Sequence, residues 1–214
     1  MEVRAEAGVL RFAARKRRDA LGHEFVRQAG LRVFRRLVAQ PWYQAATRLA
    51  LFAAIRNEPD LEGVLTDCIG RGVRVAYPRV QGSGLRFAFI DGVHALIPGA
   101  FGVLEPRDGE PVAVRDLDLV LTPGLVFDEE GGRLGYGKGF YDRAFESGGQ
   151  DPAELAIGPL RVAVCWDQQV LPAGRLVPTH SGDAPLDAIL TERRLIVCSE
   201  RLPPRSASEG RQDE

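Results

Sequence analysis

Asp118-Leu-Val-Leu-Thr-Pro-Gly-Leu-Val-Phe-Asp-Glu-Glu-Gly-Gly-Arg-Leu-Gly-Tyr-Gly-Lys-Gly-Phe-Tyr-Asp-Arg143 is the stretch of sequence that decides the fold. The run from Leu117 to Leu121, with which this stretch opens, alternates at first and is then continuously apolar. It predicts a strand covered on both faces. Thr122-Pro123-Gly124 ends this strand, because proline cannot extend a ladder and glycine allows a turn. The segment from Phe140 to Arg143 has a composition suited to the first turn of a helix.

Glycines occupy every second position between this strand and this helix, in Gly135-Tyr-Gly-Lys-Gly139. A loop with so few side chains lets backbone amides approach a bound anion closely. Arg133 and Lys138 add positive charge, and a helix N-terminus behind the loop would add a partial charge. The pattern favours a phosphate-binding loop, with a plain tight turn as the alternative. It is not a Walker A loop, because the Lys-Ser/Thr ending is missing, and its spacing does not fit the dinucleotide fingerprint.

Length and composition indicate one globular domain. The chain has 214 residues, of which 45% are hydrophobic and 27% charged. A formal net charge of −1 argues against a chain whose overall role is binding nucleic acid or anionic membranes. No apolar run approaches the length of a membrane helix, and no signal-peptide pattern opens the chain. Cys68, Cys165 and Cys198 are far apart and form no Cys-x-x-Cys pair, so we expect buried free thiols and a cytoplasmic protein.

The N-terminal segment, residues 5–40, is predicted to be helical, and Gly22 and Gly30 are predicted to mark a break or a kink. It is crowded with arginines, and three interpretations of this charge stay open. The arginines form a solvated helix face, or one or two of them point inward to a polyanionic ligand, or they form an RNA-binding surface. The last is disfavoured, because no aromatic residues interleave to form a stacking platform.

A second candidate site follows the next apolar run. Residues 48–55 predict a short buried strand, and the loop 56–60 joins it to a helix over 61–70 with Asp60 as its N-cap. Loops at strand ends are where α/β proteins tend to place ligand groups. Glu58 in this loop is either such a group or an exposed carboxylate.

Residues 123–143 read Pro-Gly-x-x-Phe-Asp-x-x-Gly-x-Arg-Leu-Gly-x-Gly-x-Gly-x-Tyr-Asp-Arg, which resembles the signature of the 5-formyltetrahydrofolate cyclo-ligase family, the methenyltetrahydrofolate synthetases. The resemblance covers roughly residues 7–196. It includes Leu10-Arg11 followed by Arg18 near the N-terminus and a Gly-x-x-Glu-Pro turn over residues 102–106. His180 lies in the C-terminal part of the resemblance. For this residue a structural or pocket-rim role is favoured over the role of a general base.

Strands and helices alternate, and the strand pair around Tyr77 and Leu85 and the final pair look antiparallel. This pattern predicts a mixed sheet with helices on both faces. The resemblance implies a three-layer α/β fold with a mostly parallel sheet and a ligand groove along one edge. We expect a single domain over residues 1–198 and a disordered tail over residues 199–214. Tyr77 and Phe87 are candidates for the pocket wall, although core packing is favoured for both.

The resemblance implies an ATP-dependent ligase that converts 5-formyltetrahydrofolate into 5,10-methenyltetrahydrofolate and releases ADP and phosphate. The formyl oxygen would attack the γ-phosphate, N10 of the folate would then close the ring, and phosphate would depart. Positioning and charge neutralisation should dominate such a step, since little covalent chemistry falls to the protein. ATP and Mg²⁺ are the expected cofactors. We expect a monomer that acts on a small molecule, with no nucleic-acid or membrane partner.

The resemblance also assigns roles to single residues. It implies catalytic roles for Arg133 and Lys138 and a magnesium-binding role for Asp142. The residues implied for ATP binding are Arg11, Arg133, Leu134, Gly135, Gly137, Lys138, Gly139 and Tyr141. The residues implied for folate binding are Glu58, Tyr136, Phe140 and Tyr141.

Two positions depart from the family pattern. Ala7 stands where the family has a lysine for the ATP phosphates, and Leu61 stands where it usually has a threonine. Either Arg4 or another basic side chain compensates for the lysine, or ATP binding is weakened. These departures motivate an alternative function, that of a non-catalytic or altered-substrate paralogue that binds a nucleotide or a pterin.

Overall fold

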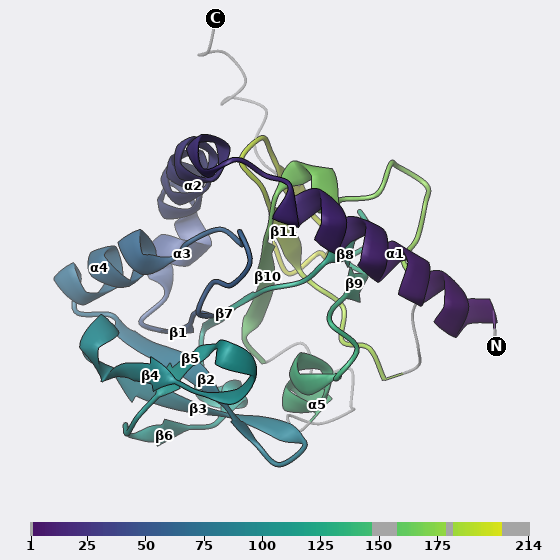
Figure 1. Cartoon of the computed structure of the whole chain (residues 1–214). Coiled ribbons are helices and arrows are strands. Elements are labelled where there is room, and N and C mark those ends of the chain that lie inside the picture. Colours follow the sequence, from purple (N-terminus) through teal and green to yellow (C-terminus); the bar gives the residue numbers. More distant parts are fainter. Residues whose placement is uncertain (1, 147–157, 179–181, 203–214) are drawn as a thin grey trace, which may run out of the picture.

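A mixed sheet of eight strands runs through the part of the chain that the computed structural model describes, residues 2–146, 158–178 and 182–202 (Figure 1). In spatial order the strands are β12 (Leu195–Val197), β11 (Ala188–Leu190), β10 (Leu160–Val164), β7 (Leu119–Thr122), β1 (Arg48–Ala50), β2 (Arg74–Gln81), β3 (Gly84–Ile90) and β6 (Pro111–Val112). The five strands from β11 to β2 are parallel to one another, and β12, β3 and β6 are antiparallel to their neighbours. The mostly parallel sheet and the two predicted antiparallel pairs, β2·β3 and β11·β12, are therefore confirmed, and the pairing of β3 with β6 is a third.

The central strands are buried on both faces, as the sequence predicted. In β7, Leu119 and Leu121 contribute to one core, whereas Val120 contributes to a second core on the other side of the sheet. The strands β1, β10 and β11 alternate in the same way. Because neighbouring side chains point to opposite faces, an uninterrupted apolar strand needs cover on both sides.

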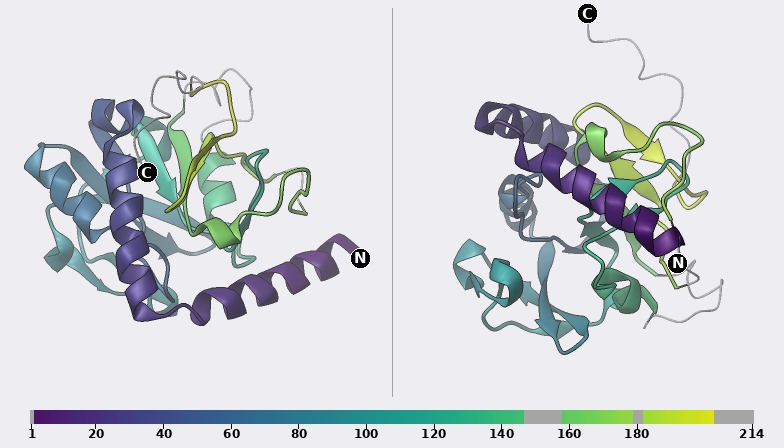
Figure 2. Two further views of the ribbon diagram at one scale, coloured as in Figure 1. Left: turned by 90° about the horizontal axis from the view of Figure 1, so that it is seen from above. Right: turned by 45° about the vertical axis from the view of Figure 1, so that its right-hand side comes forward.

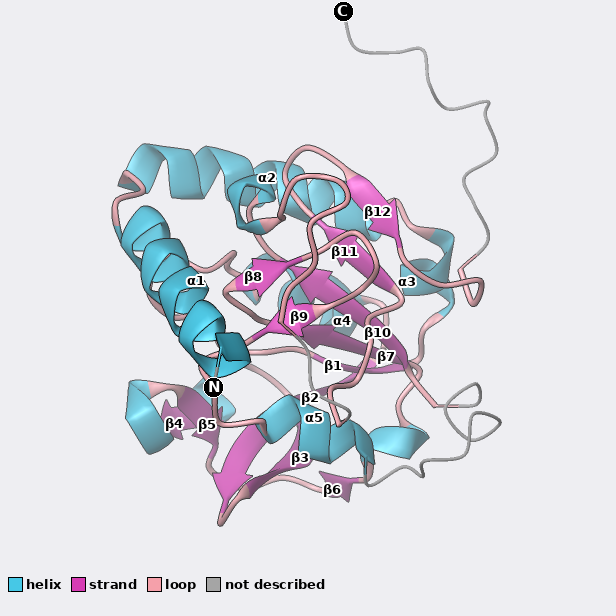
Figure 3. Cartoon of the chain, turned by 90° about the vertical axis from the view of Figure 1, so that its right-hand side faces the viewer, coloured by secondary structure: helices cyan, strands magenta, loops and turns pink. Residues whose placement is uncertain are grey.

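Helices supply that cover on both faces (Figures 1 and 3). One face packs against α2 (His23–Val38), α3 (Pro41–Ala45) and α4 (Glu62–Gly70). The other face carries α5 (Phe140–Glu146), which contacts β3 and whose Ala144 and Phe145 belong to the same core as Ala50 and Val120. On that side α1 (Glu2–Asp19) rests on a two-stranded hairpin of β8 (Val126–Phe127) and β9 (Arg133–Leu134). The expectation of helices on both faces is confirmed.

The N-terminal helical segment breaks once in the described chain, at Ala20–Gly22 between α1 and α2 (Figure 2). Gly22 takes the extended N-cap position of α2, whereas Gly30 lies inside α2. The break lets two apolar faces pack in different directions. Ala29, Val33 and Leu37 of α2 join the core beside the sheet, and α1 packs on the hairpin.

The loop-like region before β7 contains short elements. These are η1 (Val93–Ala95), β4 (Leu96–Pro98), η2 (Ala100–Gly102), β5 (Leu104–Pro106) and η3 (Val114–Asp116), and a further short turn, η4 (Asp167–Gln169), follows β10. Tyr77 and Phe87 are buried in the cores, so the favoured core role holds for both. The helix expected from residue 61 begins at Glu62, and Asp60 accepts the Glu62 N–H at 3.0 Å although Leu61 holds the N-cap position.

Residues 199–202, at the start of the expected tail, pack on the domain. Leu202 is buried, and Arg201 pairs with Asp187 at 3.0 Å. The rest of the expected tail, residues 203–214, and His180 lie outside the described residues. The three cysteines are free thiols, with Cys68 and Cys165 buried. None of the helices in the described ranges has the length and apolar content to cross a bilayer.

Asp118 ties the start of β7 to the start of β1. Its Oδ2 accepts the backbone N–H groups of Thr47 (2.8 Å) and Arg48 (2.9 Å) and the Thr47 hydroxyl (2.8 Å). Partial burial raises the pKa of Asp118, but these hydrogen bonds and the nearby charge of Arg48 together lower it below its ordinary value.

We therefore expect Asp118→Ala to lower the free energy of unfolding at neutral pH by about 1 kcal/mol, since hydrogen bonds to a carboxylate stabilise the fold and partial exposure weakens them. A carboxyl group with a depressed folded-state pKa stabilises above its unfolded value, roughly pH 4, and loses this effect as the pH falls through the folded value. Urea denaturation of both proteins at several pH values should show the difference shrinking in acid. The nearby, exposed Asp116→Ala is the control, and a difference that does not change with pH would contradict the assignment.

Candidate active site

A cavity of about 860 Å³ lies beyond the carboxyl ends of β1 and β7. Its walls include Phe52 and Glu58, which follow β1, and Pro123 and Gly124, which follow β7. Ligands of open α/β sheets tend to bind at such strand ends. All twelve residues with a role implied by the sequence line this one cavity: Arg11, Glu58, Arg133, Leu134, Gly135, Tyr136, Gly137, Lys138, Gly139, Phe140, Tyr141 and Asp142.

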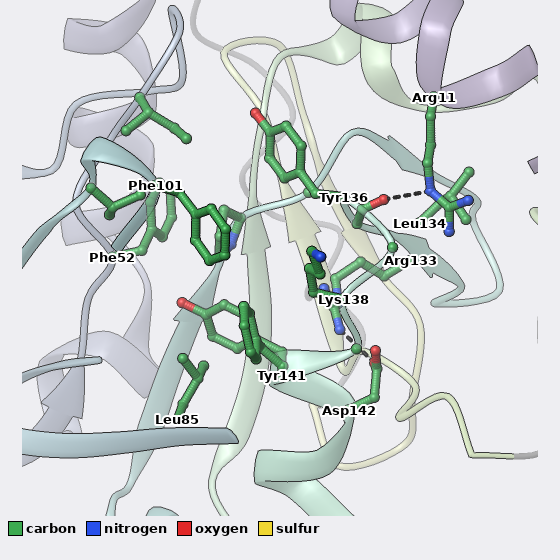
Figure 4. A pocket seen from close by; sticks show the side chains of 18 of the residues that line it. Arg11, Phe52, Leu85, Phe101, Arg133, Leu134, Tyr136, Lys138, Tyr141 and Asp142 are labelled. Atoms are coloured by element: carbon green, nitrogen blue, oxygen red, sulfur yellow. Dashed lines mark hydrogen bonds and ion pairs between the residues drawn. The ribbon is translucent and has the colours of Figure 1, made fainter. Parts of the chain in front are cut away.

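The glycine-rich loop, defined as residues 135–139, joins β9 to α5 along one wall. Gly137 (φ 92°) and Gly139 (φ 62°) have positive φ angles that other residues rarely adopt. The Arg11 Nε donates to the Gly135 carbonyl oxygen at 2.8 Å (Figure 4). A Cβ atom on Gly137 would lie 3.5 Å from the guanidinium carbon of Arg11. The loop is thus shaped closely around an arginine of α1.

Arg133 and Asp142 form an ion pair at the base of the loop. Arg133 Nη2 lies 2.5 Å from Asp142 Oδ1, and the Arg133 guanidinium lies over the Tyr141 ring at 5.4 Å (Figure 4). Arg133 is almost buried, and its Nε has no hydrogen-bond partner among the described residues. Asp142 therefore offsets much of the charge of Arg133, while one buried N–H group stays unpaired.

Lys138 reaches the same cavity from the middle of the loop. It is exposed, and its Nζ lies 5.9 Å from the centre of the Phe101 ring (Figure 4). No ion pair joins it to a described residue, so Lys138 brings an uncompensated positive charge to the cavity.

Phe101 is a cavity residue that the sequence reasoning missed. Its side chain is 72% exposed, its φ angle is 58°, and its ring lies 6.3 Å from that of Phe140. A positive φ angle at a bulky residue costs free energy and recurs at functional sites. Gly99 and Gly102 on either side of the turn are the available sequence signal, but they do not indicate where the ring points.

Glu58 lines the cavity and belongs to a buried ion pair. Its Oε1 lies 2.9 Å from Arg18 Nη1, and its Oε2 accepts the Ile55 N–H at 3.1 Å. Burial raises the pKa of Glu58, and the Arg18 guanidinium opposes that rise. Arg18 is fully buried in the last turn of α1 and is another residue whose role the sequence reasoning missed.

The backbone just before Glu58 is held in an unfavourable conformation. Arg56 (φ 49°) and Asn57 (φ 58°) both have positive φ angles. The Asn57 side chain donates to the carbonyl oxygens of Arg18 (3.2 Å) and Leu21 (3.3 Å), and the Trp166 indole donates to the Asn57 carbonyl oxygen at 2.6 Å. Each such residue costs about 1–3 kcal/mol, so these contacts are needed to keep Glu58 in place.

Three arginines of α1 face the cavity, Arg4, Arg11 and Arg15, with spacings that place them on one side of the helix. Arg4 and Arg15 make no hydrogen bond or ion pair with another described residue. Ala7, the expected lysine position, is 3% exposed and packs in the small core between α1 and the hairpin. A short side chain at this position therefore has a packing role.

The described residues contain no group of three or more histidine, cysteine or acidic side chains suited to hold a metal ion. Asp142 lines the cavity, and one of its carboxylate oxygens accepts a hydrogen bond from Arg133. Mg²⁺ commonly uses one or two protein carboxylates and takes its other ligands from water and substrate phosphates. A single carboxylate beside the glycine-rich loop fits this way of binding Mg²⁺.

Comparisons with known proteins agree with this arrangement. The model of the 5-formyltetrahydrofolate cyclo-ligase family matches residues 3–192. The mouse 5-formyltetrahydrofolate cyclo-ligase is 27% identical over 86% of this chain and 92% of its own length. The Escherichia coli K12 enzyme of the same name is 28% identical over 85% of this chain and 97% of its own length.

The fold agrees as well. The NMR structure of Aquifex aeolicus 5,10-methenyltetrahydrofolate synthetase superposes with a TM-score of 0.77 at 28% identity, covering 96% of this chain and 99% of that one. The family match spans most of the chain, and the structural match covers nearly all of it. This chain belongs to the 5-formyltetrahydrofolate cyclo-ligase family.

Proposed function

We propose that the protein converts 5-formyltetrahydrofolate into 5,10-methenyltetrahydrofolate in an ATP-dependent reaction that releases ADP and phosphate. The observation that carries this proposal is the single cavity that holds both a glycine-rich loop with cations and a buried carboxylate with aromatic walls. Its volume of about 860 Å³ lies in the range of small-molecule sites. The family membership of the chain and the names of its relatives support the same reaction class.

The glycine-rich loop is the proposed site for the ATP phosphates. The amides of Gly135, Gly137 and Gly139 would bind phosphate oxygens, and Lys138 would neutralise the charge that develops during transfer. Arg11 would contribute its terminal nitrogens, since its Nε already holds the Gly135 carbonyl. Arg133 would act together with Asp142, because the two already form an ion pair.

The part of the cavity lined by Glu58, Phe140 and Tyr141 is the proposed site for the folate. The carboxylate of Glu58 would accept hydrogen bonds from the pterin, and the rings of Phe140 and Tyr141 would pack against it. We add Phe101 to this group, because this largely exposed aromatic residue lines the cavity. These contacts would hold the formyl oxygen near the γ-phosphate, and orientation of this kind is a large part of catalysis in phosphoryl transfer.

Asp142 is the proposed protein ligand of Mg²⁺, with phosphate oxygens and water as the other ligands. The metal would supply charge neutralisation on the phosphates when bound. We further propose that the protein is a monomer and that it acts in the cytoplasm. The free state of all three cysteines supports the cytoplasmic location.

The decisive test mixes the purified protein with ATP, Mg²⁺ and 5-formyltetrahydrofolate. We expect methenyl product, followed by its near-ultraviolet absorbance, and ADP in equal amount, with neither formed when ATP or the folate is left out. Binding of ATP and folate without product would instead support the alternative function, a non-catalytic or altered-substrate paralogue.

Replacing Lys138 by Ala is expected to lower kcat/KM for ATP by about tenfold to a hundredfold, because a hydrogen bond to a charged group contributes roughly 1.5–3 kcal/mol. Steady-state kinetics with varied ATP measure this change. The matched control is Lys16→Ala, an exposed lysine of α1 that does not line the cavity. Equal kinetics in the two variants would remove Lys138 from the phosphate site.

Arg4 is the proposed substitute for the lysine that Ala7 replaces. Arg4→Ala is expected to raise KM for ATP about twofold to fivefold, because contacts between exposed charges contribute at most about 1 kcal/mol. The difference should shrink as salt is added, since exposed charges are screened. Arg17→Ala, on an exposed part of the same helix outside the cavity, is the control. An unchanged KM at low salt would show that Arg4 does not bind ATP.

A further inference from the structure

A buried arginine links the two sides of the cavity. Arg18 Nη1 donates to Glu58 Oε1 at 2.9 Å, and Arg18 Nη2 donates to the hydroxyl of Tyr136 in the glycine-rich loop. A third contact joins Arg18 Nη1 to the carbonyl oxygen of Gly124 at 3.3 Å. One guanidinium therefore holds both Glu58, which is proposed to bind the folate, and the glycine-rich loop, which is proposed to bind the phosphates.

The geometry of this link leaves little room for independent movement. Arg18 is 0% exposed, and a guanidinium is a planar group whose donors keep fixed directions. Arg11, two helical turns earlier on α1, holds the adjacent loop residue Gly135. Two consecutive loop residues are thus attached to one face of one helix. A shift of the loop at Tyr136 must either break its bond to Arg18 or move the guanidinium that Glu58 binds.

Tyr136 is suited to this link by its length and its protonation state. The residue lines the cavity and is 39% exposed, while its hydroxyl reaches the buried Arg18. Burial and the nearby charge of Glu58 raise the pKa of this hydroxyl, although Arg18 opposes the rise, so the hydroxyl stays neutral at neutral pH. The motif around it fixes the glycines on either side but leaves the residue type at this position open. A shorter side chain here would not reach Arg18.

We propose that Tyr136 is a positioning residue that couples binding at the glycine-rich loop to binding at Glu58. Phosphate binding fixes the loop and so fixes Tyr136, Arg18 and Glu58 in the arrangement that binds the pterin. Binding energies at two linked sites are reciprocal, so the folate strengthens nucleotide binding by the same factor. This inference rests on the proposed function, because it takes the loop and Glu58 as the two ligand sites.

The test is the effect of one ligand on the affinity for the other. Titration calorimetry gives the dissociation constant of 5-formyltetrahydrofolate with and without a non-hydrolysable ATP analogue and Mg²⁺. In the natural protein we expect the analogue to tighten folate binding by about fivefold or more, a typical coupling between linked sites. In Tyr136→Phe we expect the factor to fall close to one, whatever the affinity for each ligand alone.

The control is Tyr43→Phe, which also removes a hydrogen-bonded tyrosine hydroxyl. Tyr43 donates to Asp67 at 2.7 Å and does not line the cavity, so coupling should be retained in this variant. Thermal unfolding of all variants monitors the fold. If Tyr136→Phe does not fold, Tyr136→Leu removes the hydroxyl as well and serves in its place.

The outcomes separate the inference from the function on which it rests. A natural protein that binds neither ligand overturns the proposed function. A natural protein that binds both ligands without coupling, or a Tyr136 variant that keeps the full coupling, overturns the role of Tyr136 alone. Loss of coupling in the Tyr136 variant, with the Tyr43 variant unchanged, supports it.

Discussion

The cavity depends on the buried ion pair between Arg18 and Glu58. Removing two charges from water is costly, and a single buried pair regains this cost only when further hydrogen bonds satisfy both groups. Here the Ile55 amide supplies such a bond to the carboxylate, and the Gly124 carbonyl and the Tyr136 hydroxyl accept from the guanidinium. The pair therefore requires the end of α1, the loop after β1, the end of β7 and the glycine-rich loop to meet at one place. These four segments form most of the cavity wall.

Much of this structure could be predicted from local patterns. The uninterrupted apolar run of β7 indicated a strand buried on both faces, and the alternating glycines indicated a bare loop before a helix. The buried role of Arg18 could not be predicted in the same way, because this residue stands in a run of basic residues whose other members are exposed or half-buried. Nothing local distinguishes Arg18 from Arg17. The difference arises from tertiary packing, which turns one of them toward Glu58.

The two predicted catalytic cations also differ in a way that the sequence does not reveal. Arg133 and Lys138 stand five positions apart, and the sequence predicts the same catalytic role for both. In the structure Asp142 compensates the charge of Arg133, whereas Lys138 faces the cavity without an ion pair to a described residue. Phe101 was missed for a related reason, since a positive φ angle at a phenylalanine cannot be read from residue type.

The short strands at the two margins of the sheet have a consequence for behaviour at high concentration. At one margin β6 has two residues and begins with Pro111, which has no N–H group to donate, and at the other β12 has three residues. Long, flat, unpaired margins invite strands of neighbouring molecules to add to them and so seed aggregates. These two outer strands themselves offer few free backbone groups for such addition, although β6 pairs with only Phe87 and Ala88 of the longer β3. The sheet can therefore keep a very apolar centre while giving other copies of the chain little to extend.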